Sequence, residues 1–407
     1  MDVFAAVMTG QGAGAIATIQ LFGASAETVL RRVFRRKEGK SFELAAGRIL
    51  LGHIVEDGEA IDEVTIGCEG PQTFAIHCHG NPLIVERIMQ LLRHSDVQPV
   101  PADQLLLRMM SARGPRDSIG VEAKLALTTV KTVEGAAIIT HQVKAGLTRK
   151  ARQWRDSLPA MSTAEIAAEA SQILKDSESA RLIISGCTIA LIGPPNTGKS
   201  TLLNALAGRE KAIVTDIPGT TRDWVSAEIH IPPLAATIID TAGLDPTLTA
   251  SGDIGQTAQR KSGEMMERAD LILLVLDLSQ PAGQIGPDLV SRLSGKRTVV
   301  VLNKADLPAR LDPARLPEGL GQRITISAML GAGIEDLIQA IHRTCGLTGL
   351  SPGSTVAFTN RQRFLIEQLS TVDSPDRAVA LITELLLGRV DRWILTHEVG
   401  NESDTGV

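Results

Sequence analysis

A glycine-rich segment carries the residue types best suited to hold a phosphate chain. Residues 193–200 read GPPNTGKS and match the pattern G-x-x-x-x-G-K-[ST], between a strand-like run, CTIALI, and a helix-like run, TLLNALAG. In this setting the glycines let several backbone N–H groups and a helix N-terminus face one anion. Lys199 can then reach the β- and γ-phosphates, and the Ser200 hydroxyl can bind Mg²⁺. The segment therefore predicts a nucleoside-triphosphate site.

Four shorter motifs follow in the order expected of a guanine-nucleotide site. Residues 219–223, GTTRD, follow the first helix, where a threonine can sense Mg²⁺ and the γ-phosphate, and residues 240–243, DTAG, end an apolar run where an aspartate can support the Mg²⁺ shell. Residues 303–306 read NKAD. The Asp306 carboxylate can accept both N1–H and N2–H of guanine, a donor pair that adenine lacks. Residues 327–329, SAM, are positioned to offer a backbone N–H to guanine O6. Together the motifs predict GTP rather than ATP.

Hydrophobic periodicity divides the chain into four segments. Residues 1–116 combine strand-like runs with the amphipathic run NPLIVERIMQLLRH, and residues 117–184 are helical in pattern. Residues 185–346 alternate strands and helices, as in a mostly parallel, doubly wound sheet. After a Pro/Gly/Ser linker, residues 355–400 are helical again. We therefore expect an α/β fold in which a P-loop GTPase domain is inserted in an α-helical domain, after a small α+β N-terminal domain.

The composition of the chain indicates its cellular compartment and the kinds of partner it can have. The net charge of −5 argues against a generally basic nucleic-acid coat but is compatible with a local basic face. The four cysteines form no C-x-x-C pair, which predicts reduced thiols in a cytoplasmic protein. The N-terminus lacks a basic segment before its apolar residues, and no run of about 18 apolar residues occurs. Neither a signal peptide nor a membrane partner is expected.

Two N-terminal features each allow a functional and a structural interpretation. The glycines of residues 10–14 could hold an anion, although a hairpin turn between two strands is the favoured interpretation. His77 and His79 share one face of a strand and could begin a metal site. Because no third ligand is visible nearby, hydrogen-bonded or packed histidines are favoured.

The helical segment at residues 117–184 contains two notable patterns. Ser162 and Glu165 form a capping box that predicts the start of a helix. A basic stretch lies just before it and could meet RNA phosphates or simply form a solvated helix face. Its members are Lys144, Arg149, Lys150, Arg152 and Arg155.

The region around the phosphate loop resembles a known family. Residues 208–225, GREKAIVTDIPGTTRDWV, together with PPNTGKSTLLNALAG, are similar to the MnmE (TrmE) family of tRNA wobble-uridine modification GTPases. FTNRQRFL resembles the start of that family's returning helical segment, and HCHGNP resembles its G-H-G-G-P turn. The resemblance is specific over residues 187–345 and loose elsewhere. It implies a homodimer formed through a folate-binding N-terminal domain, and partnership with tRNA and an FAD-containing MnmG-type protein.

The resemblance also implies ion ligands, by position. They are Ser200 and Thr221 for Mg²⁺, and Asn196, Thr215, Ile217 and Thr220 for K⁺. Oxygen donors suit both hard cations. In this family K⁺ supplies the positive charge that an arginine finger gives other GTPases, so K⁺ and Lys199 would neutralise charge as GTP is hydrolysed to GDP and phosphate.

Motifs and resemblance together give the residues expected to bind GTP. They are Asn196, Thr197, Gly198, Lys199, Ser200, Thr201, Thr215, Asp216, Ile217, Pro218, Gly219, Thr220, Thr221, Asp240, Thr241, Ala242, Gly243, Asn303, Lys304, Ala305, Asp306, Ser327, Ala328 and Met329.

The sequence departs from the family pattern in three places. The glutamate that orients the hydrolytic water corresponds to Gly252, beside Asp253, which is a shorter carboxylate one position away and is our candidate catalytic residue with Lys199. The F-C-I-G-K motif with its modification-site cysteine is absent from the sequence, which ends in DTGV. The folate-contacting arginine and glutamate correspond to Gln20 and Ala75, and the R-P-G-E-F segment to VPADQ, so folate binding is in doubt.

Two interpretations of function remain open. The first is K⁺- and Mg²⁺-dependent GTP hydrolysis linked to tRNA wobble-uridine modification. The alternative is a GTP-dependent regulatory or scaffold module with weak hydrolysis and no modification chemistry, which Gly252 and the missing cysteine favour. A ribosome-assembly GTPase would share the phosphate loop, but it would be expected to carry a basic RNA-binding domain, which the sequence does not show.

Overall fold

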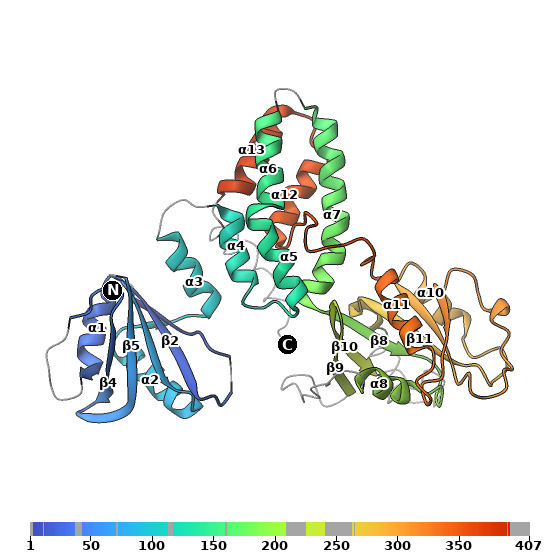
Figure 1. The fold of residues 1–407 in the computed structure, drawn as a ribbon, viewed down its shortest axis with the longest axis horizontal. Helices are drawn as coiled ribbons and strands as arrows, with labels where there is room; N and C mark the ends of the chain where they lie inside the picture. The colour runs from blue at the N-terminus through green and yellow to red at the C-terminus, as the bar shows by residue number, and fades with distance from the viewer. Residues whose placement is uncertain are drawn as a thin grey trace. The chain divides into compact units, whose positions relative to one another are not determined.

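The computed structural model describes residues 3–10, 12–36, 43–70, 72–112, 117–158, 161–208, 225–240, 263, 265–388 and 390. The chain divides into two compact units (Figure 1), an N-terminal unit built on residues up to Asp117 and a second unit spanning Ser118–Gly388. Among the described residues, no helix has the length and apolarity needed to cross a bilayer.

The N-terminal unit is a seven-stranded sheet with the strand order β3-β4-β5-β6-β2-β1-β7. Its strands are β1 (Val3–Val7), β2 (Ile16–Gly23), β3 (Phe34–Arg36), β4 (Ile49–Glu56), β5 (Glu59–Gly70), β6 (Thr73–His79) and β7 (Gln98–Pro99). Its helices are α1 (Ala26–Val33), α2 (Pro82–His94) and α3 (Ala102–Ser111). All pairs are antiparallel except β1 with β7.

Alternating side chains divide this sheet into two packed faces. Ile19 and Leu21 of β2 belong to the larger core, with Leu30 of α1 and Ile88 of α2. The opposite face carries a smaller cluster that includes Leu105 of α3. The first two strands pair antiparallel, so the glycines between them lie in a hairpin connection, as favoured from the sequence.

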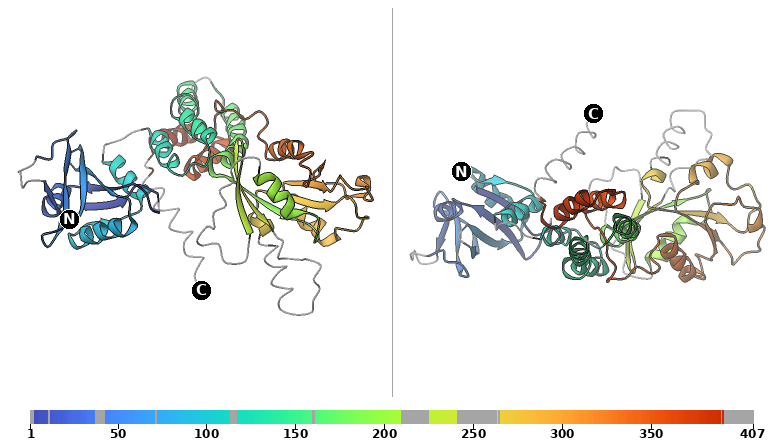
Figure 2. Two further views of the ribbon diagram at one scale, coloured as in Figure 1. Left: turned by 60° about the horizontal axis from the view of Figure 1, so that its bottom comes forward. Right: turned by 90° about the horizontal axis from the view of Figure 1, so that it is seen from above.

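The second unit contains a helical region assembled from two separate stretches of chain. Its helices are α4 (Ser118–Ala126), α5 (Val133–Lys144), α6 (Leu147–Ser157), α7 (Thr163–Ser185), α12 (Asn360–Ser370) and α13 (Pro375–Leu387). The capping box at Ser162 and Glu165 is confirmed at the start of α7. In Figure 2 the red helices α12 and α13 lie against helices from α4–α7, and Trp154, Ile366 and Leu385 share one core.

The remainder of this unit is a six-stranded sheet with the strand order β13-β12-β11-β8-β10-β9. Its strands are β8 (Cys187–Ile192), β9 (Val225–Ile231), β10 (Leu234–Asp240), β11 (Leu271–Asp277), β12 (Thr298–Asn303) and β13 (Gln322–Thr325). Its helices are α8 (Lys199–Ala207), α10 (Pro287–Leu293) and α11 (Ile334–Thr344), with a 3₁₀ turn at Pro313–Arg315.

The sheet is parallel apart from its edge strand β9, which confirms the expected P-loop GTPase architecture. Every residue of β11 and β12 is buried, as expected of strands covered on both faces. Leu203 of α8 and Leu337 of α11 join one core, and Leu293 of α10 joins the other. Strand order reverses at β8, and the carboxyl ends of parallel strands at such a point form the usual ligand crevice.

Candidate nucleotide-binding site

The phosphate loop takes a shape that requires glycine at two positions. Gly193, directly after β8, has φ 152°, and a Cβ there would overlap the carbonyl oxygen of Val275. Gly198, directly before α8, has φ 91°, and a Cβ there would overlap Nδ2 of Asn303. Asn196 lies between them with φ 60°. Because these values favour residues without a bulky Cβ substituent, the loop curls as the sequence motif predicts.

The Lys199 ammonium lies inside this loop. Its Nζ donates to the carbonyl oxygens of Gly193 and Pro194, each at 2.9 Å, and the residue is 8% exposed. The Thr197 hydroxyl donates to the Pro194 carbonyl oxygen at 3.0 Å. A phosphate entering the loop would offer the ammonium charged acceptors, which form stronger hydrogen bonds than carbonyls. The ammonium therefore lies inside the loop that the sequence motif predicts to hold a triphosphate.

Asn303 connects the phosphate loop to both guanine-recognition motifs. Its Nδ2 donates to the carbonyl oxygen of Thr197 at 2.8 Å, and its Oδ1 accepts from the backbone N–H of Ala328 at 2.9 Å. The residue is only 2% exposed. A buried amide loses free energy if its hydrogen bonds are not made, so this side chain fixes the spacing of three loops.

The carboxylate expected to recognise guanine is also held in place. Ser327 Oγ donates to Oδ1 of Asp306 at 2.5 Å, and the backbone N–H of Leu330 donates to Ser327 Oγ at 3.2 Å. The Ala305 N–H donates to the carbonyl oxygen of Ile326 at 3.0 Å. These bonds join residues 303–306 to the loop that contains the 80% exposed Met329. The structure thus brings together the described members of the two guanine motifs.

Asp277 supports the site and is not among the residues identified from the sequence. Its Oδ2 accepts from Lys304 Nζ at 2.7 Å, and its Oδ1 accepts from the Ser279 N–H and hydroxyl at 2.8 and 2.6 Å. Gln284 bonds to its backbone N–H and carbonyl oxygen at 2.9 and 2.8 Å. Lys304 is held at φ 66°. The available signal was the position of Asp277 as the polar last residue of an otherwise apolar strand.

The charge state of Asp277 follows from opposing effects. Burial raises its pKa, but the hydrogen bonds from Lys304 and Ser279 outweigh burial and hold the pKa below its ordinary value. Asp277 is therefore an anion at neutral pH. It forms a nearly buried ion pair with Lys304, with 6% and 30% of the respective side chains exposed.

The remaining expected site residues lie outside the described part of the chain. They are Thr215, Asp216, Ile217, Pro218, Gly219, Thr220, Thr221, Thr241, Ala242, Gly243 and Asp253, together with the Gly252 position and the side chain of Asp240. Of the implied ion ligands, Asn196 and Ser200 are described and exposed at the phosphate loop. Their oxygen donors fit hard cations such as K⁺ and Mg²⁺. Thr201 follows them in α8.

The two N-terminal histidines are hydrogen bonded, as favoured from the sequence. His77 Nδ1 lies 3.0 Å from Thr18 Oγ1, and His79 Nδ1 lies 2.7 Å from Asp62 Oδ1. The His79 backbone N–H also donates to Asp62 at 2.8 Å. Among the described residues, no group of three or more His, Cys, Asp or Glu side chains could hold a metal ion.

The positions implied for folate contact do not fit that ligand. Gln20 and Ala75 are paired directly across strands β2 and β6 and are 6% and 1% exposed. Gln20 Nε2 donates to Glu69 Oε2 at 3.2 Å. An amide and a methyl group supply neither the cation nor the carboxylate of the family pattern. We therefore derive no chemistry through folate.

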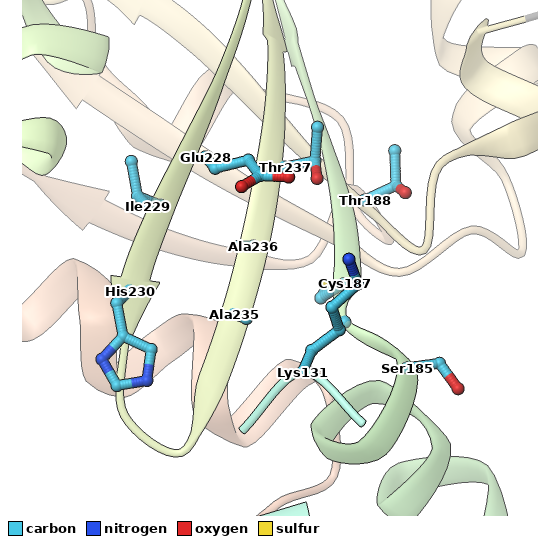
Figure 3. A pocket seen from close by; sticks show the side chains of 11 residues that line it. Lys131, Ser185, Cys187, Thr188, Glu228, Ile229, His230, Ala235, Ala236 and Thr237 are labelled. Atoms are coloured by element: carbon cyan, nitrogen blue, oxygen red, sulfur yellow. The ribbon is translucent and has the colours of Figure 1, made fainter. Parts of the chain in front are cut away.

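Figure 3 shows a hollow of the second unit, which is lined by residues of strands β8, β9 and β10. It has a volume of about 340 Å³, and its lining includes Lys131, Glu228 and Thr237. Cys187, where β8 begins, also lines it, whereas the phosphate loop follows the end of that six-residue strand. The two places are therefore about 20 Å apart along the strand. The hollow is separate from the nucleotide motifs.

Two known protein families match separate parts of the chain. Residues 3–104 match the family described as the GTP-binding protein TrmE N-terminus, and residues 188–304 match the family of 50S ribosome-binding GTPases. Among solved structures, the G domain of T. maritima FeoB matches with a TM-score of 0.32 and 25% identity, covering 39% of this chain and 98% of that one.

Curated relatives match nearly the whole chain. The tRNA modification GTPase MnmE of Clostridioides difficile is 30% identical, covering 88% of this chain and 85% of the relative. MnmE of Geobacillus kaustophilus is 30% identical, covering 91% and 88%. MnmE of Listeria innocua is 33% identical, covering 99% and 96%. The chain has a TrmE-type N-terminus followed by a GTPase domain in which Asn303 joins the nucleotide loops. It therefore belongs to the MnmE family of tRNA modification GTPases.

Proposed function

We propose that this GTPase requires K⁺ and Mg²⁺ and that its nucleotide cycle serves tRNA wobble-uridine modification. The observation that carries the proposal is Asn303, which bonds to the phosphate loop at Thr197 and to the guanine loop at Ala328. One amide thereby sets the distance between the groups that would hold the phosphates and those that would hold the base. A GTPase needs both ends of its substrate fixed, because its catalysis is mainly positioning and charge stabilisation.

Each described residue has a separate part in this proposal. Lys199 would bind the β- and γ-phosphates and neutralise charge as the γ-phosphoryl group transfers to water. Asp306, oriented by Ser327, would select guanine. Ser200 would hold Mg²⁺. A K⁺ ion bound beside Asn196 would add positive charge where an arginine finger acts in other GTPases.

We propose that the chain positions the hydrolytic water poorly. The sequence has Gly252 where the family pattern has a glutamate, and Asp253 beside it has a shorter side chain. This observation favours a second candidate function, in which GTP binding controls a regulatory or scaffold module with slow hydrolysis. Both candidates share the nucleotide site. They differ in the rate of the chemical step and in whether the chain takes part in tRNA modification.

Steady-state GTP hydrolysis separates these candidates. We expect turnover in K⁺ buffer to exceed turnover in Na⁺ buffer of equal ionic strength, and Asn196→Lys to remove the difference by placing an ammonium near the ion's position. Equal rates in the two salts would refute K⁺ dependence. Gly252→Glu should raise kcat about tenfold with little change in GTP affinity, because it would position water only in the transition state.

The control for this loop is Asp253→Ala. If wild-type hydrolysis is already fast and collapses in this variant, Asp253 performs the positioning and the slow module is excluded. The link to RNA is tested by mass spectrometry of tRNA wobble uridines from a deletion strain, where unchanged modification would contradict it. We also infer a homodimer and an MnmG-type partner, which size-exclusion chromatography with light scattering and co-purification would test.

A further inference from the structure

The basic stretch noted in the sequence is an unusual part of an otherwise acidic chain. No aspartate or glutamate occurs between Glu134 and Asp156, whereas five lysines and arginines do. The whole chain carries a net charge of −5. Positive charge is therefore concentrated at the end of α5 and along α6.

Packing fixes which side of α6 faces outward. Leu147, Ala151 and Trp154 recur at the spacing of one helical face and are fully buried. Trp154 Nε1 donates to Glu169 Oε2 of α7 at 2.6 Å, and Lys150 Nζ lies 3.2 Å from Glu169 Oε1. Glu169 thus holds the helix in one rotation and neutralises Lys150.

The opposite side of α6 presents cations. Arg149, Arg152 and Arg155 are exposed and follow one another at intervals of three residues, and the exposed Lys144 precedes them at the end of α5. Arg155 pairs with exposed Asp156 at 3.0 Å, a contact of small energetic value. Within the described part of the chain, the side chains of Lys144, Arg149 and Arg152 make no ion pair or hydrogen bond.

A second basic cluster, on the N-terminal unit, differs in this respect; it consists of Arg31, Arg32, Arg35 and Arg36. There Arg31 pairs with Glu27 at 2.7 Å, and Arg35 Nη1 donates to the carbonyl oxygens of Arg31, Arg32 and Phe34, each at 3.0 Å. Two of its arginines therefore already serve the fold. The α6 cluster keeps more of its charge available to a partner.

We infer that Lys144, Arg149, Arg152 and Arg155, the α6 basic face, bind the phosphate backbone of the tRNA substrate. The choice of RNA rests on the proposed function. The charge pattern is that of a phosphate-binding surface, since guanidinium groups pair with phosphate oxygens in a fork geometry. Such contacts orient a nucleic acid without reading its sequence. The face would thus hold the tRNA in one orientation.

The exposed side chains of α6 argue against two other partners. All exposed residues from Arg149 to Asp156 are polar. Besides the three arginines and Asp156, the exposed residue is Gln153. A helix that enters a membrane surface needs apolar side chains opposite its basic ones and free to insert, but the apolar side of α6 is buried. A protein interface usually needs exposed aromatic or aliphatic anchors, and α6 offers none.

The test measures tRNA binding by the full-length chain between 50 and 200 mM KCl. The variant carries Lys144→Gln, Arg149→Gln and Arg152→Gln, because glutamine removes charge and keeps helix propensity close to that of arginine and lysine. A matched control carries Arg32→Gln, Arg36→Gln and Arg48→Gln, which remove equal charge from exposed positions of the N-terminal unit. Circular dichroism and thermal unfolding establish that both variants fold.

We expect the α6 variant to bind tRNA at least about tenfold more weakly near 150 mM salt. Its slope of log K against log salt should fall by about 2 to 3, since each phosphate contact contributes about 0.7 to 0.9. The loss should be equal for unrelated tRNAs, and the control should change affinity less than about threefold. GTP hydrolysis in the absence of tRNA should be unchanged in both.

Four results would overturn the inference. The α6 variant could bind tRNA as tightly as the wild-type chain, or the control variant could lose as much tRNA affinity as the α6 variant. The wild-type chain could also fail to bind tRNA, or it could bind phosphatidylglycerol vesicles and not tRNA. Failure of the proposed function is seen separately, as absence of K⁺-stimulated GTP hydrolysis in the wild-type chain. The two failures can therefore be told apart.

Discussion

Asn303 and Arg361 each join three parts of the second unit through buried hydrogen bonds, one beside the nucleotide loops and one inside the helical region. Asn303 is neutral and bonds to backbone groups of two loops. Arg361 is charged and 1% exposed. Its Nε and Nη2 each donate to the Glu122 carboxylate at 2.9 Å, and its Nη1 donates to the carbonyl oxygen of Glu384 at 2.8 Å.

The partners of Glu122 close the helical network completely. Thr359 Oγ1 donates to Glu122 Oε1 at 2.7 Å, and Gln362 Nε2 donates to Glu122 Oε2 at 2.8 Å. A charge taken out of water is costly unless it is paired and fully hydrogen bonded, which this arrangement achieves. The network joins residues 239 positions apart, so it fixes where the chain returns after the nucleotide domain.

The difference between the Asn303 and Arg361 networks shows that buried polar groups can have two separate roles. Around Asn303 a small neutral amide ties the loops together, and the charged Lys199 and Asp306 bond to neutral groups of those loops, namely backbone carbonyls and the Ser327 hydroxyl. Around Arg361 every charge is satisfied within the protein. The first network sets the geometry of a site, and the second sets the connection between two halves of a helical core.

The largest expected effect comes from breaking the helical network. Arg361→Ala leaves Glu122 buried without its cation, so we expect the free energy of unfolding to fall by about 3–5 kcal/mol in urea denaturation. GTP affinity of the folded fraction should be unchanged. Arg363→Ala is the control, because Arg363 is 35% exposed and 3.9 Å from Glu178, which predicts a loss below about 1 kcal/mol. Equal losses would erase the distinction between the two arginines.

The corresponding change at the nucleotide site is Asn303→Ala. It removes the partners of the Thr197 carbonyl oxygen and the Ala328 N–H, each worth about 1–3 kcal/mol if left unsatisfied. We expect the Kd for GTP to rise by about 100-fold, measured by calorimetry. A variant that bound GTP normally but unfolded as easily as Arg361→Ala would show that Asn303 serves the fold, not the site.

The two networks also differ in how far the sequence predicts them. The phosphate loop and the two guanine motifs were predictable because each is short and follows a strand, so local spacing places it at the sheet edge. The capping box at Ser162 was predictable because its two residues, Ser162 and Glu165, are only three positions apart. The pairing of Glu122 with Arg361 could not be predicted, since nothing local marks two residues 239 positions apart as partners.

Strand β4 shows another limit of the sequence pattern. Gly52 interrupts the apolar residues of this strand, which weakens the strand signal in the sequence. In the structure a Cβ at this position would overlap the carbonyl oxygen of Arg35 and lie 2.6 Å from the Phe34 ring. The glycine is required by close approach of β3, a tertiary cause that periodicity does not report.

A smaller effect, and the sharpest test of the comparison, comes from Asp277. It is a buried charge like Glu122, but it supports the nucleotide site through Lys304. Asp277→Asn retains a hydrogen-bond acceptor and removes the charge, so we expect GTP affinity at pH 7 to weaken by about five- to tenfold, near 1 kcal/mol. The unfolding free energy should fall by a similar amount. Asp373→Asn, at an exposed position, should change either quantity by less than about 0.5 kcal/mol.

The stability difference between the wild type and Asp277→Asn should depend on pH in a definite direction. The pKa of Asp277 lies below its ordinary value because hydrogen bonds from Lys304 and Ser279 outweigh burial. The folded state therefore favours the anion, and its stabilisation is complete above the unfolded pKa of about 3.9 and is lost as pH falls through the folded value. The difference in unfolding free energy between wild type and Asp277→Asn should be constant from about pH 5 to 8 and shrink below pH 4. A difference in unfolding free energy that changed between pH 6 and 8 would show that Asp277 is not held as an anion by Lys304. Asp277 would then not be comparable with Glu122 as a paired buried charge.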